Sequence, residues 1–258
     1  MVLVGEEDYL VTGRNIIMGL DIIKNKNKDR VGKVFKIFQS RVSDNNPIEL
    51  QIIEQIEITV RTMYDQNHRF YHNIKHINAC LKSLHEYCKE TNYNPEHNHD
   101  ILKFSIVMHD SIYSSGNDTD EIHSYFLARV FASQLGEKLF KQDLEDVNDQ
   151  MESLIYVTTH AIEPSFKNKQ NCDEAIIADC DLSILGTSPE IYNKYTKNIK
   201  KEYSNLRDSY HNKMRFKFLN QLASKDSIYW TEYFKDTYGK QARENIGETL
   251  KQLKDLVY

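Results

Sequence analysis

Apolar residues recur along most of this chain three and four positions apart, which is the spacing of one face of an α-helix. A clear helix start occurs at Asn46-Pro47, where an Asn cap precedes a Pro at the first helical position. Apolar side chains then share one face up to about position 64: Ile48, Ile52, Ile56, Val60 and Met63. The pattern predicts a long amphipathic helix here.

The same spacing predicts further helices with few interruptions between them. Their expected ranges are 73–90, 99–110, 118–134, 141–159, 173–185, 189–210, 212–223 and 239–256. The chain holds only 9 Gly and 4 Pro, and Gly136 and Gly186 stand where helices should end. No hairpin signal is found. We therefore predict an all-α fold in which residues 47–258 form a single helical bundle, because no long flexible linker divides them.

Residues 1–46 differ in character from the rest of the chain. The pattern predicts one short helix around positions 16–23, a polar break at 25–30 and a second helix over 31–38. We predict a helical N-terminal extension that precedes the domain at 47–258. It could cover a pocket, form a homodimer contact or pack on the domain.

Composition is that of an ordinary globular protein, with 40% hydrophobic and 28% charged residues. The net charge of −5 gives no reason to expect nucleic acid or an anionic membrane as a partner. Four cysteines occur without a Cys-x-x-Cys pair, which favours free thiols in a reducing compartment. We find neither a signal segment nor an apolar run of ~20 residues. These features lead us to expect a cytoplasmic protein that does not cross a membrane.

Candidate chemistry begins at His72 and His76. They are four positions apart, so a helix would place both imidazoles on one face. Both could reach one metal ion, or one could bind metal while the other faces a substrate. The alternative is a pair of partly exposed histidines at a helix start.

His109-Asp110 follows an apolar run that should be core, positions 105–108. Burying a carboxylate without a partner is costly, and a metal ion would supply that partner. The alternative is that the pair marks a helix end at the surface.

Two further segments could contribute to the same site. Asp179 and Asp181 lie within an apolar stretch but cannot share one helical face, so we expect one ligand and one cap or supporting group, and favour Asp181 as the ligand. His160 ends a predicted helix, where the helix dipole alone would favour it. It could instead bind a second metal or face a phosphate.

The segment at Asp118 to Glu121 has the spacing of a capping box. That is the expected role of at least one of these acids. Glu121 could also orient a metal-bound water, since only a short loop separates it from the His-Asp pair.

Taken in order, these residues resemble a known family. His76, His109-Asp110 and Asp181 are similar to the H…HD…D signature of the HD superfamily of metal-dependent phosphohydrolases. Tyr71-His72-Asn73-x-x-His76 also resembles a segment of the cyclic-nucleotide phosphodiesterases. The nearest resemblance is to the group described as predicted HD-superfamily metal-dependent phosphohydrolases. Its pattern is echoed by Arg69-x-Tyr71-His72, His109-Asp110-x-x-Tyr113, Glu121-x-x-Ser124, Thr159-His160, Asp179-x-Asp181 and Glu202-Tyr203.

The resemblance covers about residues 47–256 and implies an HD-domain-like bundle and a reaction. It implies that His76, His109, Asp110 and Asp181 hold one divalent ion (Mn, Mg, Fe or Zn), with a second ion bridged by Asp110. It implies that His72 protonates the leaving oxygen. Arg69, Lys75 and His160 become candidates to bind phosphate, and Asp110 and Glu121 to assist catalysis. The implied substrate is a small phosphorylated molecule such as a nucleotide.

Two departures and two rival functions accompany this resemblance. The chain has Lys213-Met214-Arg215 where a Gly-Arg pair is expected. The phosphodiesterases' nucleobase-clamping glutamine has no counterpart that we can locate, and this disfavours cyclic nucleotides as substrates.

A metal- and nucleotide-binding sensor without turnover is one rival function. An HD-fold di-iron oxygenase is the other, although it would need additional histidine ligands.

Overall fold

The computed structural model describes residues 29–43, 46–93, 99–161 and 172–257, and within these ranges it contains helices and no strand. The all-α prediction is confirmed. The α-helices are α2 (Arg30–Gln39), α3 (Pro47–Tyr64), α4 (Ile74–Thr91), α5 (His99–Met108), α6 (Asp120–Leu135), α7 (Glu137–Phe140), α8 (Leu144–Tyr156), α9 (Asp173–Leu182), α10 (Pro189–Glu202), α11 (Asp208–Ala223) and α12 (Glu232–Val257). Two 3₁₀ turns join them, η1 (Val157–Thr159) and η2 (Ser183–Gly186).

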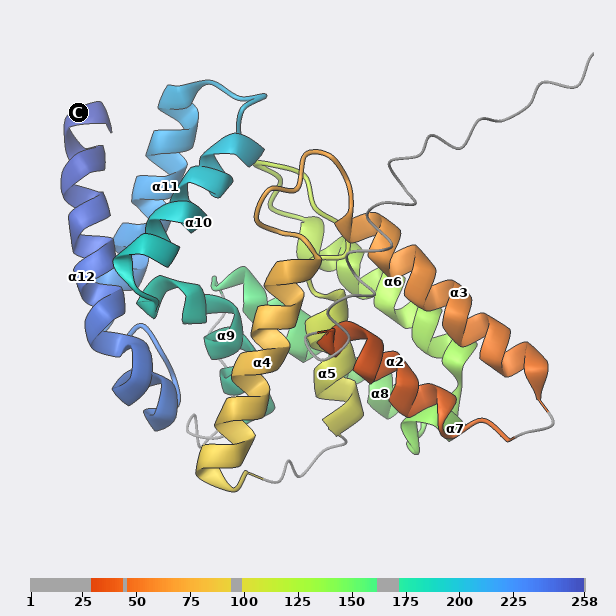
Figure 1. Cartoon of the computed structure of the whole chain (residues 1–258). Coiled ribbons are helices and arrows are strands. Elements are labelled where there is room, and N and C mark those ends of the chain that lie inside the picture. Colours follow the sequence, from red (N-terminus) through yellow and green to blue (C-terminus); the bar gives the residue numbers. More distant parts are fainter. Residues whose placement is uncertain (1–28, 44–45, 94–98, 162–171, 258) are drawn as a thin grey trace, which may run out of the picture.

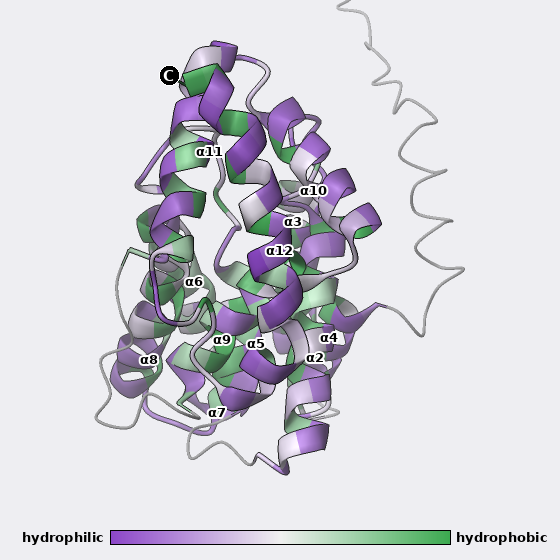
Figure 2. Ribbon diagram, turned by 90° about the vertical axis from the view of Figure 1, so that its left-hand side faces the viewer, coloured by the Kyte–Doolittle hydropathy of each residue, from purple (hydrophilic) through white to green (hydrophobic). Residues whose placement is uncertain are grey.

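Helices α4, α5 and α9 form the centre of the molecule (Figure 1). Helices α10, α11 and α12 gather on one side of them, and α2, α3, α6, α7 and α8 lie on the other. Nearly every residue of α5 and α9 is buried, and both helices carry apolar runs, positions 104–108 without a charge in α5 and 175–178 in α9. Most outer helices carry hydrophobic residues toward the centre and hydrophilic residues outward (Figure 2), whereas α6 also exposes Ile122, Phe126 and Val130.

Several helix starts follow the expected capping chemistry. The side chain of Asn46 accepts a hydrogen bond from the Glu49 N–H, and Pro47 opens α3. The side chain of Asn73 likewise accepts from the Lys75 N–H and fixes the start of α4. Of these two caps, Asn73 lies at the end of the segment between α3 and α4 and marks where that segment passes into α4.

The N-terminal boundary drawn at residue 46 does not coincide with a break in packing. Val31, Phe35 and Phe38 of α2 are fully buried in the same core as the helices that follow. The Asn78 side chain of α4 also accepts hydrogen bonds from the N–H groups of Arg30 and Val31. The helix predicted at 16–23 lies outside the described residues.

Some predicted helix boundaries were wrong. The helix predicted over 189–210 ends at Glu202, and α11 starts at Asp208, because a turn at 203–207 separates them. The last helix begins at Glu232 rather than at 239. The capping box at Asp118 and Glu121 does not form. Instead Asp120 accepts hydrogen bonds from Ser114 and Asn117 and closes the loop before α6.

Gly186 allows a close approach between η2 and α12. A Cβ atom at this position would lie 2.5 Å from the carbonyl oxygen of Tyr238, so only glycine fits.

No helix in the described part of the chain is long and apolar enough to cross a membrane.

Candidate metal centre

The loop before α4 is locked in place by Arg69. Its guanidinium donates hydrogen bonds to the backbone carbonyls of His72 (3.1 Å), Asp110 (2.6 Å) and Ser111 (2.8 Å). Its Nε donates to Gln66. The side chain is 6% exposed. Arg69 therefore ties the His72 segment to the end of α5, and these contacts use four of its five N–H donors. Its expected role as a phosphate ligand stays a prediction.

Four predicted ligands converge from three parts of the chain. His76 lies in the first turn of α4, His109 and Asp110 follow α5, and Asp181 lies near the end of α9. The His76 Nε2 is 3.4 Å from an Asp110 oxygen and 3.1 Å from an Asp181 oxygen. The His109 Nε2 is 3.2 Å and 3.6 Å from the same two oxygens.

These separations suit a shared cation. Divalent ions bind N and O ligands at about 2.0–2.2 Å, so neighbouring ligand atoms in a tetrahedral or octahedral shell lie about 3.0–3.5 Å apart. Both histidine side chains are 2% exposed, whereas those of Asp110 and Asp181 are 15% and 19% exposed. The protein thus closes the imidazole side of the cluster and leaves the carboxylate side open to a water or substrate.

His109 is oriented as a metal ligand. Its Nδ1 lies 2.9 Å from the carbonyl oxygen of Ile106 and donates its hydrogen to it, which turns Nε2 toward the two carboxylates. The buried Nε2 forms no well-aligned hydrogen bond among the described residues, and the Asp110 and Asp181 oxygens are the acidic atoms beside it. A buried polar atom without a partner is costly, and a cation at the cluster would supply one.

The charges of the cluster call for a cation. Burial alone would lower the pKa of the His109 imidazole, but Asp110 and Asp181 raise it well above its ordinary value of 6.5. Burial alone would raise the pKa values of both carboxyls, yet the imidazoles hold them well below 3.8. The two carboxylates therefore stay ionised, and without an ion they are balanced by protonated imidazoles, whose protons a divalent ion would replace.

His160 extends the cluster on the Asp181 side. Its Nε2 lies 2.8 Å from the second Asp181 oxygen. Its backbone is in the left-handed region, with φ 56°, which is uncommon for residues other than glycine. The turn after η1 thus points the His160 imidazole at Asp181, where it can bind metal or substrate.

His72 lies beside this cluster and is held by Glu202, a residue to which sequence reasoning gave no role. The Glu202 carboxylate is 2.7 Å from the His72 Nδ1 and accepts hydrogen bonds from the N–H groups of Tyr71 (2.6 Å) and His72 (2.9 Å) and from the Tyr113 hydroxyl (3.0 Å). Burial would raise its pKa, but these donors keep it below 4.5. The only sequence signal was the Glu202-Tyr203 pair within the family-like pattern.

Asp179 and Asp181 take different roles, as the sequence suggested. The fully buried Asp179 accepts hydrogen bonds from the N–H groups of Trp230 and Thr231 and from the Thr231 hydroxyl, each 2.8–2.9 Å long. It therefore fixes the segment that leads into α12. Only Asp181 reaches the cluster.

Glu121 lies close enough to Asp110 for the Asp110 charge to raise the pKa of the Glu121 carboxyl. Burial first and the Asp110 charge second raise the pKa of its carboxyl. This location is compatible with the predicted role of orienting a water, although no contact of Glu121 with the ligands defines that role.

A cavity of about 320 Å³ opens beside His76 and Asp181. It is lined by Lys75, Lys82 and Ala79 of α4 and by Ile191, Lys194 and Asn198 of α10. Lys82 pairs with Glu86, whereas Lys75 and Lys194 have no acidic partner among the described residues. The cavity therefore presents two unpaired cations next to the candidate metal centre.

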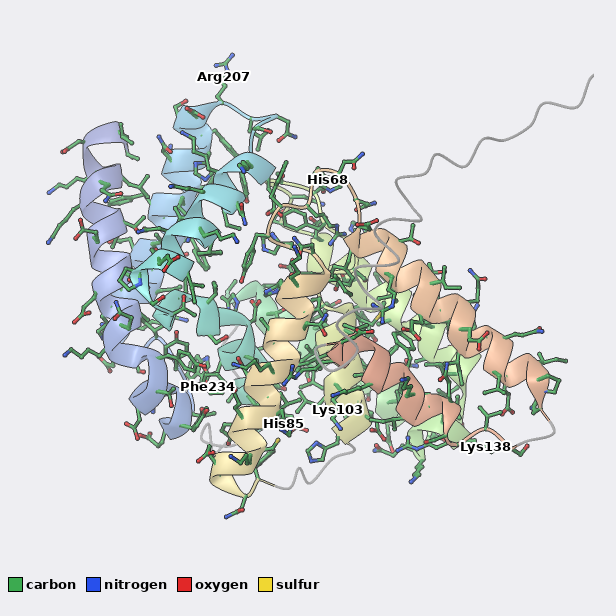
Figure 3. The ribbon with its side chains drawn as sticks, in the orientation of Figure 1. His68, His85, Lys103, Lys138, Arg207 and Phe234 are labelled. Carbon is green, nitrogen blue, oxygen red and sulfur yellow. The ribbon has the colours of Figure 1, made fainter. Side chains whose placement is uncertain are left out.

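Among the described residues, the histidines farther along the chain from the cluster do not form a metal-binding group with it. His68 lies in the loop before α4, and His85 lies on the other half of α4, away from the centre (Figure 3). The described residues form two groups that could hold an ion: His76, His109 and Asp110, and His76, Cys80 and Asp181. Neither includes His68, His85 or His99, so the extra ligands that the oxygenase alternative needs are not found there.

No protein-family model matches this chain, and no curated protein sequence matches it either. The resemblance to HD-type phosphohydrolases therefore depends on the short motifs alone, and the geometry of the candidate metal centre is the remaining guide to function.

Proposed function

We propose that the protein is a metal-dependent phosphohydrolase acting on a small phosphate ester or anhydride, such as a nucleotide. The observation that carries this proposal is the convergence of His76, His109, Asp110 and Asp181, with the buried Nε2 of His109 lacking any other partner. Mixed imidazole and carboxylate donors suit manganese, iron, magnesium or zinc. His160 would add a fifth donor or contact the substrate.

A divalent ion bound by these residues would supply a water of lowered pKa and would polarise a phosphoryl oxygen. The chain must then provide the proton for the leaving oxygen. His72 is placed for this task, because Glu202 occupies its Nδ1 and leaves Nε2 free to carry a transferable proton. Tyr113 stacks on the His72 ring, with centroids 4.2 Å apart, and shares the same carboxylate, so the imidazole is fixed on two sides.

The adjoining cavity would receive the rest of the substrate. At about 320 Å³ it lies at the small end of ligand pockets, which span about 300–1,000 Å³, and this favours a small molecule over a polymer. Lys75 and Lys194 would neutralise phosphate oxygens from facing helices. Phe70 and Ile191, 42% and 51% exposed at the same cavity, offer apolar contact to an organic group such as a nucleobase.

The proposal is tested by measuring phosphate release from nucleoside mono-, di- and triphosphates and from cyclic nucleotides, with manganese added. Asp110→Ala should remove both bound metal and activity. Asp118→Asn, an exposed acid in the nearby loop, serves as the matched control and should keep both. Elemental analysis of the same samples reports the metal.

Three results are distinguishable. Release that disappears only in Asp110→Ala supports the proposal and identifies the substrate class. Bound metal and bound nucleotide without release would replace the hydrolase by a sensor. Wild-type protein that holds no metal would refute the site itself.

A further inference from the structure

Arg215 on α11 is a buried cation without an anionic partner. It is 8% exposed, and its Nη1 donates to the Tyr195 hydroxyl at 2.9 Å. Its Nε and Nη2 have no hydrogen-bond partner among the described residues. A buried guanidinium with two unused donors is unfavourable, so this arrangement calls for a ligand that the protein itself does not provide.

His211 repeats this feature one turn earlier on the same helix. It is 6% exposed, its Nδ1 lies 3.2 Å from the Asn212 side chain, and its buried Nε2 has no partner in the described part of the chain. Residues four apart lie on one face of a helix. The unused nitrogen atoms of His211 and Arg215 therefore belong to one face of α11.

This face lies one aromatic layer from the candidate metal centre. The Arg215 guanidinium stacks over the rings of Tyr195 (4.9 Å) and Phe218 (5.6 Å). The Phe218 ring is 6.3 Å from that of His160. On the other side, Tyr195 packs against Tyr71 at 4.5 Å, and Tyr71 against His76 at 4.8 Å. Tyr71 and Tyr195 also line the cavity described above.

We propose that Arg215, with His211 beside it, binds a phosphate group of the substrate other than the one that reacts. The unused Nε and Nη2 form the edge of the guanidinium fork, which matches two oxygens of one phosphate. The inference rests on the proposed function and narrows it to substrates that carry a second phosphate group separated from the reacting one by the width of this aromatic layer. It also assigns the phosphate-binding arginine to position 215 instead of 69.

The test separates this site from the metal centre by using full-length protein that carries Asp110→Ala throughout. Inorganic phosphate is titrated into this protein by calorimetry, alone and with Arg215→Met or Arg207→Met added. Arg207 extends into solvent at the start of α11 and is the matched control (Figure 3). Loss of a charge-assisted, two-pronged contact should weaken phosphate binding about 10- to 100-fold for Arg215→Met. The Arg207→Met protein should bind phosphate unchanged.

Thermal unfolding distinguishes a binding residue from a structural one. Without phosphate, Arg215→Met should leave Tm unchanged or raise it, because the uncompensated buried charge is gone. Phosphate should then raise Tm in the control and not in Arg215→Met. Equal phosphate affinity of the two variants would overturn the proposal, and so would a lowered Tm of Arg215→Met that phosphate does not influence.

Arg215→Lys covers the case in which the methionine variant does not fold. It keeps the charge but loses the fork, so phosphate should bind about 10-fold more weakly than in the control. Affinity equal to the control would again overturn the assignment. Because every protein in the series lacks Asp110, the outcome does not depend on whether the metal centre hydrolyses anything.

Discussion

The substitution Glu202→Gln tests most directly whether Glu202 keeps His72 in the protonated form that can donate a proton to the leaving oxygen. Gln keeps one oxygen that can accept from the N–H groups of Tyr71 and His72. Its other terminal atom becomes an NH₂ group, which faces the His72 Nδ1, now 2.7 Å from a carboxylate oxygen. The NH₂ can only donate, so Nδ1 must become an acceptor and the ring proton moves to Nε2 on a neutral imidazole. His72 then cannot act as a charged acid.

The expected loss follows from the size of general acid catalysis, which is about 10²- to 10⁴-fold. The rate constant kcat should fall by that factor, while KM and metal content stay within about two-fold, because Glu202 contacts none of the four metal ligands. The buried side chain also loses hydrogen bonds to a charged acceptor, at about 1.5–3 kcal/mol. For a chain of this size, Tm should fall by about 3–12 °C.

The assay is phosphate release under single turnover, comparing Glu202→Gln, His72→Ala and the double variant. Residues that act as one unit give non-additive effects, so the double variant should be no slower than the slower single one. A Glu202→Gln protein with the wild-type rate would refute the reasoning. A double variant slowed by the product of both factors would refute it as well.

Three further outcomes are expected. Lys194→Ala should raise KM about 5- to 30-fold in steady-state assays through lost charge contact with phosphate, whereas Lys197→Ala, exposed on the same helix outside the cavity, should not. Burial raises the pKa of Asp179 to about 7 from 3.8, so its contribution to stability should fall as pH rises through this interval, and Asp179→Asn should remove that trend from Tm measured at pH 5–8. Chelation should lower Tm by about 5–10 °C, because the ion stabilises only the folded state.

The helical fold was predictable because apolar periodicity is a local property of the sequence. The same holds for the candidate metal ligands, since His109-Asp110 and Asp181 stand out as polar residues at or inside apolar runs that we expected to be buried. Helical spacing predicted that Asp179 and Asp181 take different positions, and the family-like pattern favoured Asp181 as the ligand. Their partners confirm that the two acids take separate positions.

Features that depend on distant contacts could not be predicted. Glu202 meets His72 across 130 positions of sequence, and nothing local marks it as the carboxylate that orients that imidazole. The sequence shows that Arg69 carries a positive charge, which suggested a phosphate ligand. It does not show that Arg69 is buried and donates to the carbonyls of Asp110 and Ser111. Arg215 was noticed only as part of a departure from a motif. That its Nε and Nη2 lack a partner can be seen only in the structure, where α11 packs against Tyr195 of α10.

The most direct test of the central claim is anomalous diffraction from crystals of the full-length protein grown with manganese. The account predicts one strong peak within bonding distance of His76, His109, Asp110 and Asp181, and its disappearance in Asp110→Ala crystals. A peak elsewhere, or none at these residues with the His109 Nε2 bonded to another protein group, would contradict it.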